Sequence, residues 1–210
     1  MDHRVRYLTD SSKLSRMGRC ELSSTKTIKN DLRWCRTERS LMSSLGTQLS
    51  RTPLDKVKVT ELCRDADVSK ATFYLHYCDI YDLADAFVDA RVETVIDELG
   101  DPCLPFQDVG SFVRRFVEVF TSDDQKRFLK LADENHMAPR FLNRFWRKLG
   151  EKLESCAPVP DEERARIAMS FVIGGLVCAV QSDHDVDADE LVDTLARLMT
   201  ATMSAAPEAS

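Results

Sequence analysis

The sequence lacks the signatures of several common classes of protein. No stretch approaches the roughly 18 consecutive apolar residues that a membrane-spanning helix needs, and no apolar block follows the charged N-terminal residues as it would in a secretory signal. There is no HExxH zinc motif, no phosphate-binding glycine loop and no serine nucleophile elbow. We therefore expect a cytoplasmic protein without a membrane anchor, which is not an enzyme and uses no cofactor or metal ion.

Cysteine pairs at short spacing are also lacking. Seven cysteines are scattered along the chain, and none belongs to a CxxC motif. An odd number spread in this way favours reduced thiols over a framework of disulfides. We expect the cysteines to act as small hydrophobic residues of the core.

Charge is unevenly distributed, although the net charge is only −6. Residues 1–78 hold 15 lysines and arginines against 9 acidic residues, a net of +6, whereas residues 79–210 hold 14 against 26, a net of −12. This asymmetry favours an N-terminal part that meets an anionic partner, with a chance distribution of surface charge as the alternative.

Apolar residues recur at helical spacing along most of the chain, without convincing strand alternation. The sequence therefore predicts an all-α fold of about nine helices. They are expected at about residues 28–49, 59–66, 70–77, 80–99, 107–121, 123–135, 138–156, 161–182 and 187–203. Residues 1–24 are polar and basic without sustained periodicity, and we expect them to form a flexible basic arm.

The residues from Val59 to Ile80 have the pattern of a helix-turn-helix. A short helix is followed by a break at Asp67, and Ser69 is a natural N-cap for the helix that begins at Lys70. The side chains expected to face inward are Val68, Phe73, Tyr77 and Ile80. The side chains expected to face outward are Lys70, Thr72, Tyr74, Leu75 and His76. This pattern predicts a helix-turn-helix domain at 25–79.

The outward side chains suit contact with DNA. In a helix-turn-helix unit the second helix enters the major groove. Lysine, hydroxyl and imidazole groups donate to phosphate oxygens, and the exposed Leu75 suits a thymine methyl group. The alternative is a plain solvated helix face capped by Ser69, which explains the lysine but not so many aromatic donors.

The stretch VKVTELCRDADVSKATFYLHYCDIYDL resembles the DNA-binding signature of TetR-type transcriptional regulators. The matching positions are Val59, Leu62, Ala66, Val68, Ser69, Thr72, Phe73, Tyr74, His76, Tyr77 and Leu83. The resemblance covers about residues 37–88, and it implies that Thr72, Tyr74 and His76 contact phosphates or base edges. It also implies that Lys70 and Leu75 select the operator.

The chain departs from the family pattern at two positions. The turn glycine usual in the family is Asp67 here, and because aspartate tolerates a left-handed conformation, we expect the turn to survive. The lysine usual three residues after Tyr77 is Ile80 here, so one expected phosphate contact is missing. Basic residues that would compensate are Arg33, Arg36, Arg39 or those of the N-terminal arm.

The resemblance also implies a dimer that binds a palindromic operator, because a two-fold protein reads two half-sites. In this chain SFVIGGLVCAV and the last helix supply a candidate dimer surface. Its residues are Met169, Val172, Gly174, Gly175, Leu176, Val180, Leu195 and Leu198. The alternative is that the GG-containing helix is buried within one subunit.

Residues 80–210 are predicted to bind an effector and to dimerise. Apolar side chains with a few polar groups are typical of a ligand pocket. The candidate lining is Phe116, Phe120, Phe128, His136, Phe141, Phe145, Trp146 and Met169. The alternative is that each of these residues simply belongs to the core.

The resemblance predicts a dimeric repressor that an effector releases from DNA. Residues 125–153 are similar to a TetR subgroup that includes regulators of dihydroxyacetone kinase operons, in which the signal can be a partner protein. The alternative function is therefore a protein-interaction module or co-activator of the same fold, controlled by a protein partner and with weak or no DNA binding.

Overall fold

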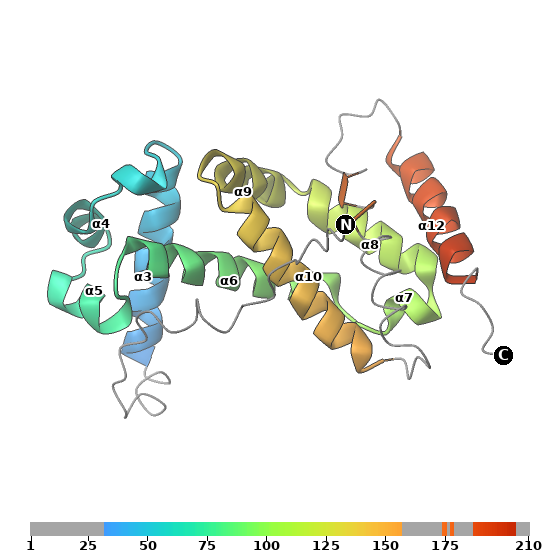
Figure 1. Cartoon of the computed structure of the whole chain (residues 1–210), viewed down its shortest axis with the longest axis horizontal. Coiled ribbons are helices and arrows are strands. Elements are labelled where there is room, and N and C mark those ends of the chain that lie inside the picture. Colours follow the sequence, from blue (N-terminus) through green and yellow to red (C-terminus); the bar gives the residue numbers. More distant parts are fainter. Residues whose placement is uncertain (1–31, 157–173, 176, 179–186, 205–210) are drawn as a thin grey trace, which may run out of the picture. The chain divides into compact units, whose positions relative to one another are not determined.

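The computed structural model describes residues 32–156, 174–175, 177–178 and 187–204 (Figure 1). Every regular element in these ranges is helical, which confirms the predicted all-α class. The elements are α3 (Leu32–Leu49), the 3₁₀ turn η1 (Leu54–Lys56), α4 (Val59–Asp65), α5 (Lys70–His76), α6 (Ile80–Leu99), α7 (Leu104–Gln107), α8 (Val109–Thr121), α9 (Asp123–Glu134), α10 (Ala138–Glu154) and α12 (Ala188–Ser204). None of these helices combines the length and the apolarity required to cross a lipid bilayer.

The chain divides into two compact units, residues 1–84 and residues 85–210. The division lies inside α6, whereas the sequence placed the domain boundary at the start of this helix. Some predictions fall outside the described residues: the basic arm at 1–24 and the side chains of Met169, Val172, Leu176 and Val180.

In the first unit, the core is built where α3 meets α4. Leu41, Leu45 and Leu62 are fully buried there. Two serines of α3 donate to carbonyl groups at the end of α4, where the Leu62 carbonyl also accepts from the Ala66 N–H at 2.9 Å. The Ser44 hydroxyl donates to the Leu62 carbonyl at 3.2 Å, and the Ser40 hydroxyl donates to the Ala66 carbonyl at 2.7 Å. The end of α4 is thereby fixed against α3.

The turn between α4 and α5 is a Schellman motif with Asp67 in the left-handed region at φ 54°. The Asp67 N–H donates to the Arg64 carbonyl at 3.2 Å, and the Val68 N–H donates to the Cys63 carbonyl at 2.9 Å. Aspartate adopts this conformation more readily than most non-glycine residues. The expectation that the turn survives without its glycine is confirmed.

In the second unit, aromatic rings of α8, α9 and α10 form a continuous cluster. Consecutive ring centroids lie between 4.4 and 6.1 Å apart. The rings are those of Phe112, Phe116, Phe120, Phe128, Phe141 and Phe145. α12 packs against α8 (Figure 1), and an Arg114–Asp189 ion pair of 2.7 Å joins the two helices.

The prediction that the cysteines are reduced is wrong for two of them. Cys103 and Cys156 form a disulfide, with Cα atoms 5.2 Å apart and a sequence separation of 53 residues. Whether two cysteines can pair depends on how close the fold brings their Cα atoms, which their spacing in sequence does not encode. Cys63, by contrast, is a buried thiol of the core, and burial raises its pKa.

Candidate DNA-recognition surface

The start of α5 is fixed by the predicted cap at Ser69. The Ser69 Oγ accepts a hydrogen bond of 3.0 Å from the Thr72 N–H, while Ser69 itself has extended backbone angles. The two hydroxyl groups of Ser69 and Thr72 also lie 2.8 Å apart, within hydrogen-bonding distance. Replacing such a cap typically costs about 1 kcal/mol. The helix therefore begins at Lys70, as predicted.

The inner side of α5 is anchored by aromatic residues. Phe73 is fully buried, and Tyr77 and Ile80 are buried as well, as the sequence predicted. Val68 is only half-buried. Burial, with smaller contributions from the charges of Glu38 and Asp82, raises the pKa of Tyr77 above its ordinary range.

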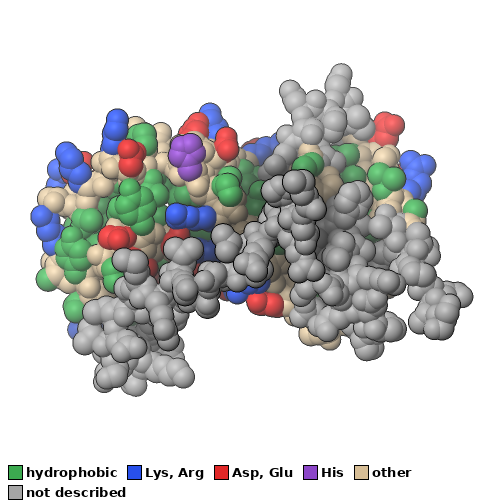
Figure 2. Space-filling view, viewed as in Figure 1, with side chains coloured by type: hydrophobic (Ala, Val, Ile, Leu, Met, Phe, Trp, Pro, Cys, Tyr) green, Lys and Arg blue, Asp and Glu red, His purple; other side chains and the backbone are tan. Residues whose placement is uncertain are grey.

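The outer side of α5 presents both charge and exposed apolar surface. Tyr74 and Leu75 are 58% and 68% exposed, and Lys70 is exposed beside them. Thr72 is half-buried, and Arg39 is exposed on α3. Figure 2 shows hydrophobic side chains over α4 and α5, with lysine and arginine side chains around them. This combination matches the requirements for phosphate and thymine-methyl contacts.

His76 does not belong to the outer face, and the prediction that it points outward is wrong. Its side chain is only 3% exposed and stacks on Trp34 of α3, with ring centroids 3.6 Å apart. The His76 Nδ1 lies 3.9 Å from the Glu38 Oε1, and the Trp34 Nε1–H donates to the same oxygen at 2.9 Å. α3 therefore covers the end of α5. The contact joins residues 42 positions apart in the chain, so the helical pattern of α5 does not indicate it.

The environment of His76 predicts a dependence of stability on pH. Burial lowers its pKa below the ordinary value of about 6.5, although the charge of Glu38 acts in the opposite direction. As the pH falls towards 6.5, the unfolded chain binds a proton at His76 more readily than the folded chain does. The free energy of unfolding should therefore fall as the pH drops from 7 to 5. Urea unfolding at several pH values measures this effect. In His76→Phe the part due to this group should vanish, and an identical pH profile for variant and wild type would contradict the prediction.

The start of α6 adds negative charge next to α5. The Asp79 Oδ1 accepts hydrogen bonds of 2.8 Å from the Tyr81 and Asp82 N–H groups, and the Asp82 Oδ2 accepts one of 2.9 Å from the Cys78 N–H. Free N–H groups at a helix start are ready binding sites for phosphate. Here carboxylates occupy them, and Ile80 is buried where the family usually has lysine. The D-x-x-D spacing of Asp79 and Asp82 is the sequence signal for this cap, which was not among the predictions.

The residues proposed for an effector pocket divide into three groups. The phenylalanines at 116, 120, 128, 141 and 145 are buried in the aromatic cluster, and Trp146 is half-buried at its edge. His136 is exposed and ends α9 in the left-handed region at φ 56°, so its expected place in a pocket lining is wrong. Met169 lies outside the described residues. An effector pocket within this cluster stays a prediction.

One buried polar group of the second unit was not expected from the sequence. Gln125 is fully buried, and its Oε1 accepts two hydrogen bonds from the guanidinium of Arg91. The sequence gives no simple signal that Gln125 is buried. The apolar face of α9 is predicted from residues such as Phe128, and a polar residue on that face is not expected.

The residues proposed for a dimer surface also differ in exposure. Leu195 is buried, Leu198 is 60% exposed, Gly174 is half-buried and Gly175 is exposed. An exposed leucine on α12 fits a surface that a second subunit covers. The dimer itself stays a prediction.

Together these elements define a protein of two units. The first is a helix-turn-helix unit in which α5 is the candidate recognition helix, and the second is all-helical. The sequence matches no protein-family model and none of the curated proteins. Solved structures do match the fold, and their similarity narrows the class of protein.

One similar structure is that of a protein described as a TetR-family transcriptional regulator, from Mesorhizobium loti. It has a TM-score of 0.59 at 16% identity, and the alignment covers 83% of this chain and 98% of that one. Salmonella enterica GusR has the same TM-score at 13% identity, covering 84% and 99%. The fatty acid degradation regulator FadR from Bacillus halodurans gives a TM-score of 0.51 at 15% identity, covering 78% and 94%. The chain thus has the fold of TetR-family transcriptional regulators.

Proposed function

We propose that the protein is a DNA-binding transcriptional regulator of TetR type. The observation that carries this proposal is the outer face of α5, where Lys70, Tyr74 and Leu75 are exposed on a helix capped by Ser69 and anchored by the buried Phe73. A merely solvated face would explain Lys70. It would not explain an adjacent tyrosine and leucine that are both more than half exposed to water.

The proposal includes a homodimer that acts as a repressor. Two copies of α5 related by a two-fold axis would read the two halves of a palindromic operator, with half-sites about one helical turn apart or a multiple of it. An effector bound in the second unit would then release the DNA, because a ligand that favours one of two conformations shifts the population towards it. Such a regulator works in the cytoplasm, where the DNA is.

A second candidate function is a protein-interaction module or co-activator of the same fold, controlled by a protein partner. The start of α6 favours it. The carboxylates of Asp79 and Asp82 lie where a DNA-binding helix-turn-helix gains from positive charge, and Ile80 replaces the lysine that the family resemblance leads one to expect. Both features weaken attraction to phosphate.

DNA affinity across a salt series separates the two functions. We expect the protein to protect a palindrome upstream of its own gene, with affinity that falls steeply as the salt concentration rises. Lys70→Ala should lower the slope of log affinity against log salt by about 1 for each lost phosphate contact, or about 2 for a dimer. Tyr74→Ala should weaken binding about tenfold with little change in the slope, because it removes a contact of about 1–3 kcal/mol. Fluorescence anisotropy with labelled DNA measures both quantities.

Matched variants make this test decisive. Lys130→Ala removes an exposed lysine of α9 in the second unit and should leave DNA binding unchanged. If wild type and a Lys70→Ala/Tyr74→Ala double variant bind the DNA equally weakly, the interaction-module function is the better one. His76→Ala is unsuitable for this purpose, because it removes the packing against Trp34.

A further inference from the structure

The disulfide between Cys103 and Cys156 joins two helix ends. We propose that these cysteines are a reversible thiol–disulfide pair, oxidised by a hydroperoxide, which fastens the end of α10 to the end of α6 and thereby raises the affinity of the protein for DNA. The part of this inference that concerns DNA rests on the proposed function. The chemistry of the pair does not.

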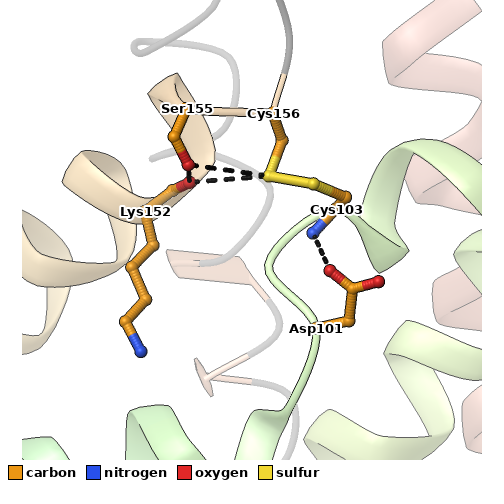
Figure 3. Close-up of a disulfide and its surroundings, with 5 residues drawn as sticks. All are labelled: Asp101, Cys103, Lys152, Ser155 and Cys156. Atoms are coloured by element: carbon orange, nitrogen blue, oxygen red, sulfur yellow. Dashed lines mark hydrogen bonds between the residues drawn. A yellow bond between two sulfur atoms is a disulfide. The ribbon is translucent and has the colours of Figure 1, made fainter.

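Both cysteines lie just beyond the helices that they connect. Cys103 follows the end of α6 and precedes α7, while Cys156 follows the end of α10 (Figure 3). The Cys103 N–H donates to the Asp101 Oδ1 at 2.9 Å, and the Cys156 N–H donates to the Leu153 carbonyl at 2.9 Å. Local hydrogen bonds therefore hold both backbones in place. Both residues are half-buried, so the disulfide lies near the surface of the unit.

The same two helices are joined by a ladder of ion pairs. Acidic side chains of α6 and basic side chains of α10 each recur every four residues, which places each set on one helix face. The ion pairs are Arg140–Asp85 (3.0 Å), Arg144–Asp85 (3.3 Å), Arg144–Asp89 (3.1 Å), Lys148–Glu93 and Lys152–Asp97 (3.5 Å). Because the numbers rise together, α6 and α10 run in the same direction. Cys156 stands four residues after Lys152, so the disulfide continues this ladder.

Without the disulfide, the last ion pair of the ladder, Lys152–Asp97, holds the ends of α6 and α10 together only weakly. Asp97 is 75% exposed and Lys152 is 42% exposed, so water and salt screen their attraction. Buried apolar side chains, such as Leu99 of α6 and Leu153 of α10, add contacts that do not depend on salt. Reduction therefore leaves the end of α10 held by non-covalent contacts, of which the charged ones respond to salt.

The oxidation balances with a hydroperoxide as the oxidant. One thiolate attacks the outer peroxide oxygen, the O–O bond breaks, and an alcohol (or water, from hydrogen peroxide) leaves behind a sulfenic acid. The second thiol attacks that sulfur, the S–O bond breaks, and water leaves as the disulfide forms. The two thiols thus lose two electrons and two protons to the peroxide. A dithiol reverses the reaction by two thiol–disulfide exchanges and becomes a disulfide itself.

The effect on DNA affinity follows from the position of α6. This helix begins four residues after α5 ends, and it continues without a break to Leu99, near Cys103. A helix whose far end is fixed has fewer conformations to lose when DNA orders the helix-turn-helix, so the oxidised form should bind more tightly. The coupling is a difference between two states of one element and is therefore measurable as a ratio of affinities.

The first test follows the thiols in the full-length protein. Reduction with dithiothreitol under native conditions should expose two additional thiols, and hydrogen peroxide should remove them again. Peptide mapping after alkylation should find Cys103 and Cys156 linked only in the oxidised sample. A bond that resists millimolar dithiothreitol in the folded protein, or that does not re-form with peroxide, would overturn the inference.

The second test measures thermal unfolding of the two redox forms. The melting temperature of the reduced wild type should be lower by about 5 °C or more, because a disulfide between residues with a sequence separation of 53 restricts the unfolded chain. Cys103→Ser/Cys156→Ser should match the reduced wild type and should not respond to dithiothreitol. Melting temperatures that are equal for both redox forms of the wild type would contradict the proposal that the disulfide holds the ends of α6 and α10 together.

The third test compares DNA affinity. The oxidised wild type should bind the upstream palindrome about fivefold more tightly than the reduced form, and the double serine variant should bind with one affinity in both conditions. Equal affinities of the two wild-type forms, or a redox effect that persists in the double serine variant, would overturn the regulatory role. If neither form binds any DNA, the proposed function fails. The thiol and melting tests still show whether Cys103 and Cys156 form a reversible disulfide.

Discussion

Replacing Phe73 with alanine is expected to lower the free energy of unfolding of the helix-turn-helix unit by about 3–5 kcal/mol. Phe73 is fully buried on the inner side of α5, where it contacts the ring of Tyr77 at a centroid distance of 6.0 Å. Its removal leaves a cavity and takes away the anchor of a helix of seven residues, which is too short to be stable alone. Urea unfolding followed by circular dichroism measures the loss.

The neighbouring Tyr74 is the matched control for this prediction. It is 58% exposed on the outer side of the same helix, so Tyr74→Ala should change the stability by no more than about 0.5 kcal/mol. Both variants should bind DNA poorly, but only Phe73→Ala should do so because it unfolds. A loss below about 1 kcal/mol in Phe73→Ala would mean that α5 is held by other contacts.

The helices of the first unit were predictable because their signals are local. A helical period, the cap at Ser69 and the apolar inner face together predicted where α4 and α5 lie, and α6 has the predicted bounds. Each of these signals acts within about four residues along the chain. The left-handed turn at Asp67 was predictable for the same reason, since it depends on the intrinsic preference of one residue.

The errors concern contacts between segments far apart in sequence. His76 was assigned to the outer face of α5 because the period of one helix cannot indicate that Trp34 of another helix covers its end. The disulfide was missed because residues 103 and 156 meet only when α6 and α10 have paired. His136 was mistaken for a pocket residue, although its role is to end α9 with a positive φ. For His76 and the two cysteines the tertiary arrangement decided the outcome, whereas the positive φ of His136 belongs to a local helix end.

The largest effect expected in the second unit comes from the contact between Arg91 and Gln125. The Arg91 Nε–H donates to the Gln125 Oε1 at 2.8 Å, a terminal N–H donates to the same oxygen at 2.5 Å, and another pairs with Asp124. The guanidinium carbon also lies 5.5 Å from the centroid of the Phe128 ring. Because the amide oxygen must face the cation, the Gln125 Nε2 points away from it and is buried without a hydrogen-bond partner in the described part of the chain.

Arg91→Leu should therefore lower the free energy of unfolding by about 3 kcal/mol. It would leave the amide of Gln125 buried with neither end paired, and an unpaired buried polar group costs about 1–3 kcal/mol, to which the loss of the contacts with Asp124 and Phe128 adds. Urea unfolding of the single variants and of Arg91→Leu/Gln125→Leu completes a double-mutant cycle. The double variant should be more stable than Arg91→Leu alone, because removing both polar groups leaves none of them buried and unpaired.

Arg127 supplies the control for this cycle, since it pairs with the same acid from an exposed position. Its terminal nitrogen lies 3.9 Å from Asp124, and its side chain is 76% exposed. An exposed ion pair of this kind contributes about 0–1 kcal/mol, so Arg127→Leu should have a small effect. If Arg91→Leu proved as mild as Arg127→Leu, water would satisfy Gln125 in the variant. If the double variant lost the sum of the two single losses, Arg91 would stabilise the unit through its packing on Phe128 and its charge on Asp124, and the buried amide would contribute nothing to the coupling.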